Sequence, residues 1–140
     1  MAPLRKHFTR DLDSLGAVFD LLALFATQEE LDTSSQHDLA LALDELFTNM
    51  VKYQPANRND IEIELRAEQE TVTVKLVDRD VDKFDLTAKQ DPYLGRSVKK
   101  RAPGGLGIYL TKRVVDDVQY HYGDRTSTIT LIKKFRRRHV

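Results

Sequence analysis

The sequence has no cysteine, no net charge and no long apolar run, and each absence excludes a class of protein. Without cysteine the chain can form neither a disulfide framework nor a thiolate metal site, which fits a reducing compartment. The 22 basic and 22 acidic side chains cancel, so no overall field attracts the chain to nucleic acid or to anionic lipid. No apolar run approaches the length of a membrane span, and the N-terminus lacks the apolar region of a signal peptide. We therefore expect a cytoplasmic protein that binds neither membrane nor nucleic acid directly.

The length of 140 residues suits one hydrophobic core and is short for two, so we expect a single domain over residues 1–140. No internal repeat, low-complexity stretch or linker divides it. The first half predicts a short strand at 4–10 and two amphipathic helices at 13–30 and 33–53. The second helix starts with a threonine followed three residues later by a glutamine, the spacing of a capping box.

The second half contains strand patterns and a long irregular segment. IEIEL at 61–65 and TVTVKLV at 71–77 alternate with period two and predict an antiparallel hairpin. Periodicity is absent from Asp78 to Gly105, and connections of that length are typically functional lids or binding loops. A helix is expected at 108–118, and a second hairpin, VQYHYG with STITLIKKF, follows it. The element order predicts an α+β fold: a two-layer α/β sandwich with a mixed, mostly antiparallel sheet and helices on one face.

The helix at 33–53 carries polar side chains that a purely structural helix does not need. Glu45 and Asn49 are four residues apart, so they project from one face of the helix, one turn apart. The amide oxygen of Asn49 is a hard, neutral ligand suited to Mg²⁺, and the carboxylate of Glu45 can orient or deprotonate an attacking group. Lys52, three residues further on, can add positive charge for a phosphate. On spacing alone, a solvated helix flank with an i,i+4 polar pair is the more common explanation.

The stretch PGGLGIYL places Gly104, Gly105 and Gly107 directly before a helix. Glycine lets the backbone approach an anion closely, and the free N–H groups and the positive end of the helix point at it. A flexible turn that leads into a helix explains the same glycines, so the cluster alone decides nothing. A nucleoside triphosphate with Mg²⁺ satisfies both this cluster and the Glu45–Asn49 pair.

Two stretches resemble motifs of the GHKL ATPases. LALDELFTNMVKY resembles their N box, a Glu-x-x-x-Asn core with a basic residue three positions after the Asn. PGGLGIYLTKRVVDDVQY resembles their second glycine box, in the form found in bacterial anti-sigma-factor serine kinases. The order and separation of the two boxes match, and the similarity covers roughly residues 35 to 132. By this resemblance Glu45 is the general base, Asn49 is the Mg²⁺ ligand and Lys52 reaches phosphate.

The same resemblance implies ATP and Mg²⁺ as cofactors and a Bergerat-type α/β sandwich as the fold. The irregular segment from Asp78 to Gly105 corresponds to a lid-like loop between the two boxes. The phosphates are then held by the side chains or backbone of Lys99, Lys100, Gly104, Gly105, Leu106 and Gly107.

The chain departs from the family pattern between the two boxes. The family's first glycine box is usually Asp-x-Gly followed by Phe-Asp, and its Asp accepts a hydrogen bond from the adenine amino group. This chain has LVDRDVDKFDLT, in which Asp80 and Val81 stand where glycine is expected. Asp78, at the end of a predicted strand, is the first choice for the adenine contact and Asp80 is the second. A charged strand end explains the same carboxylates without any ligand.

The resemblance implies an ATP-binding anti-sigma regulatory factor that phosphorylates a small antagonist protein on serine, with a sigma factor as its other partner. The altered glycine box keeps two alternatives open. One is a non-catalytic module in which the nucleotide only switches partner affinity, and the other is an interaction domain without nucleotide. Whether the chain forms a homodimer also stays open.

Overall fold

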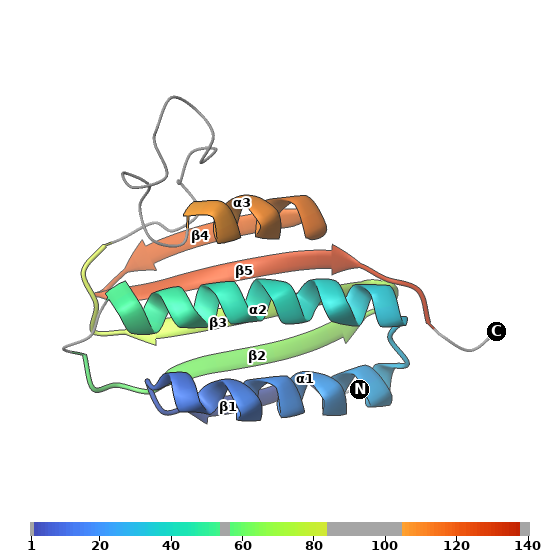
Figure 1. Ribbon diagram of the computed structural model, residues 1–140, viewed down its shortest axis with the longest axis horizontal. Coiled ribbons are helices and arrows are strands. Elements are labelled where there is room, and N and C mark those ends of the chain that lie inside the picture. Colours follow the sequence, from blue (N-terminus) through green and yellow to red (C-terminus); the bar gives the residue numbers. More distant parts are fainter. Residues whose placement is uncertain (1, 54–56, 84–104, 138–140) are drawn as a thin grey trace.

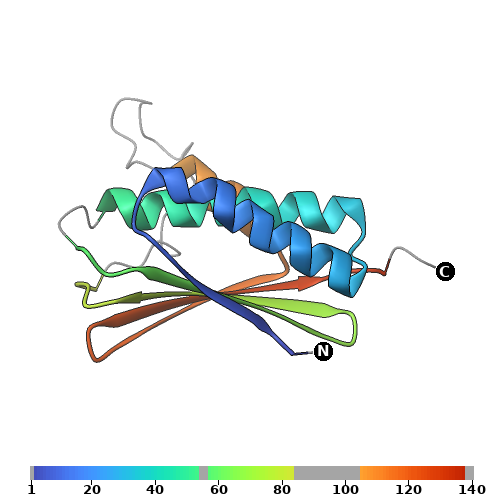
Figure 2. The ribbon, with the colours of Figure 1, turned by 90° about the horizontal axis from the view of Figure 1, so that it is seen from below.

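The helical and alternating patterns of the sequence separate into two layers. The structure is a computed structural model that describes residues 2–53, 57–83 and 105–137, and at 105–109 it describes the backbone alone. Helices α1, α2 and α3 lie together on one face of the sheet (Figures 1 and 2). This arrangement confirms the predicted two-layer α+β sandwich. In chain order the elements are β1 (Leu4–Phe8), a 3-10 helix (Leu12–Ser14), α1 (Leu15–Glu29), α2 (Thr33–Tyr53), β2 (Ile61–Glu68), β3 (Thr71–Arg79), α3 (Gly105–Val114), β4 (Asp117–Gly123) and β5 (Thr126–Lys134).

The five strands have the order β1-β2-β3-β5-β4, and all four pairings are antiparallel. The helical hairpin of α1 and α2 returns the chain to the end of the sheet that β1 reached, so β2 runs opposite to β1. β5 lies between β3 and β4, so these two strands, which run in the same direction, are not neighbours. The expected mixed sheet is therefore refined to an antiparallel one over the described strands, because the last hairpin separates the parallel pair.

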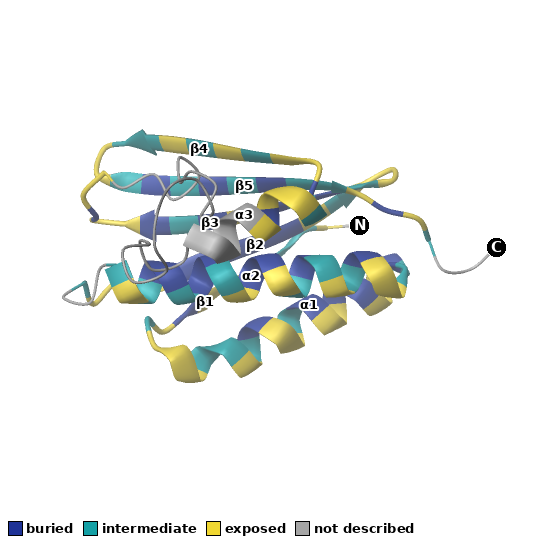
Figure 3. Cartoon of the chain, turned by 45° about the horizontal axis from the view of Figure 1, so that its top comes forward, coloured by how far each residue is buried: buried dark blue, intermediate teal, exposed yellow. Residues whose placement is uncertain are grey.

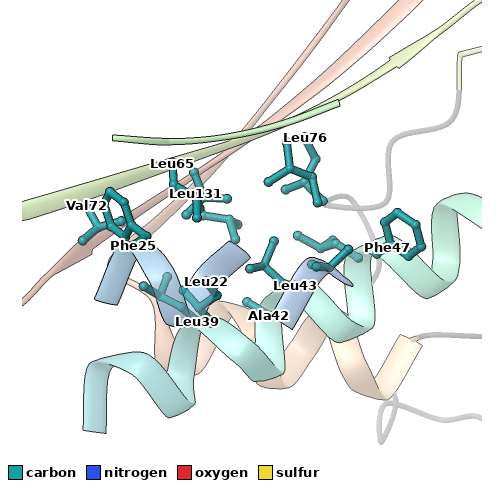
Figure 4. Close-up of a cluster of buried hydrophobic side chains, with 14 of the residues drawn as sticks. Leu22, Phe25, Leu39, Ala42, Leu43, Phe47, Leu65, Val72, Leu76 and Leu131 are labelled. Carbon is teal, nitrogen blue, oxygen red and sulfur yellow. The ribbon is translucent and has the colours of Figure 1, made fainter. Parts of the chain in front are cut away.

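The core fills the space between α1, α2 and the inner face of the sheet (Figure 4). Figure 3 shows that both helices bury the side that faces the sheet and expose the opposite side. On the sheet, alternation directs Ile61, Ile63 and Leu65 of β2 inward, and all three are fully buried. α2 is amphipathic as predicted, and its apolar stripe is buried with no member more than 4% exposed: Leu39, Ala42, Leu43, Leu46, Phe47 and Met50.

The start of α2 differs in one detail from the expected capping box. The helix begins at Thr33 as predicted, but its cap is Asp32, whose carboxylate accepts the backbone N–H of Ser35 at 3.0 Å. The other oxygen accepts the backbone N–H of Arg136 at 3.1 Å, so one side chain ties the helix start to the segment after β5. Burial raises the pKa of Asp32, but the hydrogen bonds from Ser35 and Arg136 outweigh it and hold the pKa below its ordinary value. The contact with Arg136 joins residues far apart in the sequence, which explains why the local pattern suggested the wrong cap.

The last helix, α3, begins and ends earlier than the predicted 108–118. It starts at Gly105 and ends at Val114, and Val118 belongs to β4 instead. Lys133 of β5 donates to the Val114 carbonyl at 2.6 Å and to the Asp38 carboxylate of α2 at 2.9 Å. This ammonium satisfies a carbonyl that the helix end leaves open, and it joins α3 to both the sheet and α2.

Candidate functional site

Three of the predicted site segments meet at one end of the molecule. Figure 1 shows the C-terminal end of α2, the end of β3 and the start of α3 on the same side. α3 also packs against α2. Elements that are distant in the sequence therefore face one another at this end.

Glu45 and Asn49 of α2 form a hydrogen-bonded pair in this region. The Asn49 amide donates to a Glu45 carboxylate oxygen over 2.5 Å. Asn49 is 2% exposed and Glu45 is half-buried, so a solvated helix flank does not describe Asn49. The buried neighbours Leu46 and Met50 hold this part of the helix against the core. Because burying an amide without a partner is unfavourable, the bond to Glu45 also stabilises Asn49 in this position.

Two further residues of α2 lie beyond this pair, toward the end of the helix. Lys52 is exposed, as a side chain that meets an anion from solvent should be. Tyr53 is half-buried, and burial raises the pKa of its hydroxyl. The negative charge of Glu45 raises that pKa further. The sequence patterns did not single out Tyr53.

Asp78, the first choice for the adenine contact, is a buried member of β3 and not a solvated strand end. It is 3% exposed, and its carboxylate forms an ion pair with Arg10, which lies just after β1. The same guanidinium donates to the Met50 carbonyl at 2.9 Å and to the Asn59 carbonyl at 3.2 Å. Burial raises the pKa of Asp78, and the bond and charge of Arg10 offset part of that rise. No sequence motif marked Arg10, because its partner is 68 positions away.

Ser127 of β5 is a second residue that the sequence patterns did not select. It pairs with Asp78 in the register of β3 and β5, and it is 7% exposed. Directly opposite side chains on neighbouring strands lie on the same face of a sheet, about 5 Å apart at Cβ. The inner face of the sheet therefore presents a carboxylate and a hydroxyl side by side, both beneath the helical layer.

Asp80, the second choice for the adenine contact, faces a different partner. Its backbone has φ 60°, in the left-handed region that glycine favours and that Asp tolerates better than most residues. The turn thus keeps a conformation suited to the glycine that the family pattern has here. The Asp80 side chain is 70% exposed and pairs with Arg125 at 2.9 Å, and Arg125 also bonds Asp82 at 3.1 Å. Asp78 and Asp80 are thus each held by an arginine, Asp78 in the interior and Asp80 at the surface.

The turn after β3 is held in place by the hairpin of β4 and β5. The backbone N–H of Val81 donates to the Arg125 carbonyl at 3.0 Å. The hydroxyl of Tyr122 donates to the Val81 carbonyl at 2.7 Å. These bonds position the chain directly before the segment that the sequence predicts as a lid.

The phosphate contacts expected from the second glycine box are described only in part. Gly105, Leu106 and Gly107 form the first turn of α3, where the backbone N–H groups have no acceptor within the helix. Lys99, Lys100 and Gly104 lie outside the described residues, as does most of the predicted lid. Across the described parts of the chain, no group of three or more His, Asp or Glu side chains is placed to hold a metal ion.

Comparison with known proteins gives the family. Residues 8–133 match the family described as histidine kinase-like ATPase domain. The chain belongs to this family. Within the described ranges, no helix of this histidine kinase-like ATPase domain is both long and apolar enough to cross a membrane.

Two curated relatives of the domain are both named serine-protein kinase RsbW. The serine-protein kinase RsbW of Listeria innocua is 33% identical over an alignment of 98 residues, and the match covers 66% of this chain and 62% of that protein. The serine-protein kinase RsbW of Bacillus velezensis is 28% identical over an alignment of 117 residues, and the match covers 70% of this chain and 72% of that protein. The match thus spans about 62% of the length of the Listeria relative.

A solved structure shares the fold of this histidine kinase-like ATPase domain. It is a crystal structure of the RsbU and RsbW domains of a protein from Mycobacterium tuberculosis, with a TM-score of 0.70. The likeness covers 96% of this chain and 33% of that chain, at 16% sequence identity. At this identity the comparison supports the architecture and not the chemistry.

Proposed function

We propose that this chain binds ATP with Mg²⁺ and acts as an anti-sigma regulatory factor that phosphorylates a small antagonist protein on serine. The observation that carries the proposal is the part-buried, hydrogen-bonded pair of Glu45 and Asn49 on α2, the helix against which α3 packs. The proposal is also supported by the family, which is one of ATPase domains, and by two relatives that are named serine-protein kinases. The sigma factor and its antagonist as partners, and a cytoplasmic location, follow from the resemblance of the two boxes.

The donor set fits a magnesium nucleotide at its phosphate end. The amide oxygen of Asn49 and the carboxylate of Glu45 are hard oxygen ligands, which Mg²⁺ prefers. Mg²⁺ is usually bound by one or two protein oxygens and completed by water and phosphate, so a site with few protein ligands is suitable. The free N–H groups of Gly105, Leu106 and Gly107 at the start of α3 suit phosphate oxygens.

Each residue then has a distinct role in phosphoryl transfer. Asn49 holds Mg²⁺, which neutralises the charge of the phosphates when it is bound. Glu45 accepts the proton of the serine hydroxyl as the serine oxygen bonds to the γ-phosphorus and ADP departs. Lys52 adds positive charge from the exposed flank of α2, and Lys99, Lys100 and Gly104 complete the phosphate contacts.

The non-catalytic alternative is favoured by one observation. Asp78, the carboxylate assigned to adenine, already forms a buried ion pair with Arg10. A nucleotide whose adenine cannot reach Asp78 binds mainly through its phosphates. Weak binding of that kind suits a switch better than a kinase.

Phosphate transfer tests the proposal against this alternative. The purified chain is incubated with ATP, Mg²⁺ and the sigma-factor antagonists of the same organism, and serine phosphorylation is followed by mass spectrometry together with ADP release. We expect one ADP for each phosphoserine and no reaction in EDTA. Magnesium-dependent ATP binding without transfer to any antagonist would favour the switch. The absence of ATP binding in calorimetry would contradict both nucleotide hypotheses.

A further inference from the structure

The guanidinium of Arg10 connects separate parts of the chain through separate nitrogens. Nη2 donates to Asp78, Nη1 donates to the Met50 carbonyl in the last turn of α2, and Nε donates to the Asn59 carbonyl. The bond to Asp78 can therefore break while the other two bonds keep the side chain in place. Met50 directly follows Asn49, so this contact also borders the proposed magnesium ligand.

We propose that Arg10 is a specificity-determining residue that competes with the nucleotide base for the carboxylate of Asp78. The inference rests on the proposed ATP binding, because it concerns the base end of the same site. The Arg10 and Asp78 side chains are 3% and 5% exposed, so the carboxylate lies buried against the guanidinium and offers little surface to a ligand. The amino group of adenine gains access to the carboxylate only in molecules in which Nη2 has released it.

The competition is unequal for a chemical reason. A guanidinium makes charge-assisted hydrogen bonds to a carboxylate, and these are roughly twice as strong as bonds from a neutral donor such as the adenine amino group. The base alone therefore displaces Arg10 poorly, and the phosphate end supplies most of the affinity. If the carboxylate is released in about one molecule in ten, the apparent Kd for ATP is about tenfold above its intrinsic value.

Asp80 cannot replace Asp78 as the base contact in this structure. Its carboxylate pairs with Arg125 at the surface, outside the layer that holds Asp78 and Ser127. The two carboxylates near the expected first glycine box are thus both held by arginines of the chain itself. Of these two pairs, the Arg10–Asp78 pair is the buried one.

Base selectivity measures this competition directly. ATP is compared with purine riboside triphosphate, which lacks the 6-amino group, in calorimetry with Mg²⁺. For the wild type we expect the two Kd values to agree within about twofold, since the carboxylate is occupied. For Arg10→Met we expect ATP to bind about tenfold more tightly than in the wild type, with no change for purine riboside triphosphate.

Two further variants separate competition from a change in the fold. Arg5→Met is the matched control, because Arg5 is an arginine of β1 whose side chain is 59% exposed and pairs with Glu64. It should leave both Kd values unchanged. Arg10→Lys keeps the charge but cannot form all three bonds of the guanidinium, so the gain in ATP affinity should be intermediate. Circular dichroism shows whether Arg10→Met folds. If it does not, Arg10→Lys still tests the competition.

The outcomes distinguish this inference from the proposed function. Suppose that the wild type binds ATP, and that both Arg10 variants prefer ATP over purine riboside triphosphate no more than the wild type does. Arg10 then does not compete with the base, and the proposed ATP binding is unaffected. If the wild type binds no triphosphate but an Arg10 variant binds ATP, the competition is supported and the proposed function of the wild type is not. If neither the wild type nor the Arg10 variants bind, both are overturned.

Discussion

Asn49 shows how burial separates a site residue from a surface residue of the same type. Four-residue spacing of a carboxylate and an amide occurs on many solvated helices, but here the amide is 2% exposed and bonded to Glu45. Its helix position is set by the apolar stripe on either side of it. A polar group held in this way, on a helix against which α3 packs, is available to a cation that arrives with its own phosphate and water ligands.

Replacing Asn49 tests the proposed magnesium contact. Asn49→Ala should weaken Mg-ATP binding by more than the ~1 kcal/mol of an ordinary neutral hydrogen bond, because it removes a ligand of a bound cation. Calorimetry at saturating Mg²⁺ measures the change, and circular dichroism checks the fold. Thr48→Ala, at the neighbouring half-buried position, is the control and should bind normally. Equal ATP affinity in wild type and Asn49→Ala would remove Asn49 from the site.

Replacing Glu45 separates chemistry from binding. Glu45→Gln keeps the size of the side chain and its acceptor for the Asn49 amide, but it cannot take a proton at neutral pH. Phosphorylation of the antagonist should fall by ~10²–10⁴-fold while the ATP Kd changes little. Asp44→Asn, on the exposed neighbour, should retain the wild-type rate. A Glu45→Gln variant as active as the wild type would show that another group acts as the base.

At the scale of elements, β1 is an edge strand of the sheet. Ion pairs on the outer face of the sheet link it to β2. Arg5 donates to Glu64 of β2 at 2.6 Å, and Glu62 contacts Arg5, His7 and Arg79. The hydrogen bond from Arg5 lowers the pKa of Glu64 below its ordinary value, although burial acts in the opposite direction. Charged side chains of this kind also protect an edge strand from pairing with another chain.

The lowered pKa of Glu64 predicts a pH dependence of stability. A carboxyl whose pKa is depressed by folding stabilises the native state above its unfolded pKa, and this contribution is lost as pH falls through the folded pKa. Wild type should therefore exceed Glu64→Gln in urea stability at about pH 7, and the two should converge as Glu64 protonates. Glu68→Gln, on the same strand but exposed, is the control. A difference that persists in acid would show that the lost stability does not come from the charge.

The first turn of α3 is the element that should respond most to a triphosphate. Its N–H groups have no acceptor within the helix, and the N-terminal end of a helix attracts anions. We expect hydrogen exchange at residues 105–108 to slow when ATP and Mg²⁺ are added, more than with ADP. Strand β5 is the internal control, because it pairs with a neighbouring strand on each side. Unchanged exchange in α3 would separate this helix from the phosphate site.

At the scale of the whole molecule, the core spans both layers and is shared by α1, α2 and the sheet. We expect residues 1–140 to unfold in one cooperative transition, with circular dichroism and the fluorescence of the five tyrosines giving the same urea midpoint. A single ligand site stabilises the native state by about 2.7 kcal/mol at a hundredfold excess over Kd, so Mg-ATP should raise that midpoint. Two separated transitions would show that the chain does not behave as one domain.

The local patterns of the sequence determined the elements and their order. Period two in β2 and β3 and the helical spacing of α1 and α2 depend on contacts that repeat within a few residues, so they can be read from the chain. The spacing of Glu45 and Asn49 is equally local, and the structure brings the two side chains together as that spacing requires. The end of β3 at Asp78 and Arg79 was also close to its predicted place.

Tertiary structure decided the features that join distant residues. Asp32 caps α2 because it also binds Arg136, and α3 ends at Val114 where Lys133 meets it. Arg10 reaches Asp78 from the far side of β2, and Ser127 faces Asp78 only because β5 inserts next to β3. Such contacts depend on strand order and on how the layers pack, and no local period carries that information. The helix that carries Glu45 and Asn49 is thus determined by the local sequence. The pairing of Asp78 with Arg10 is determined by the tertiary structure.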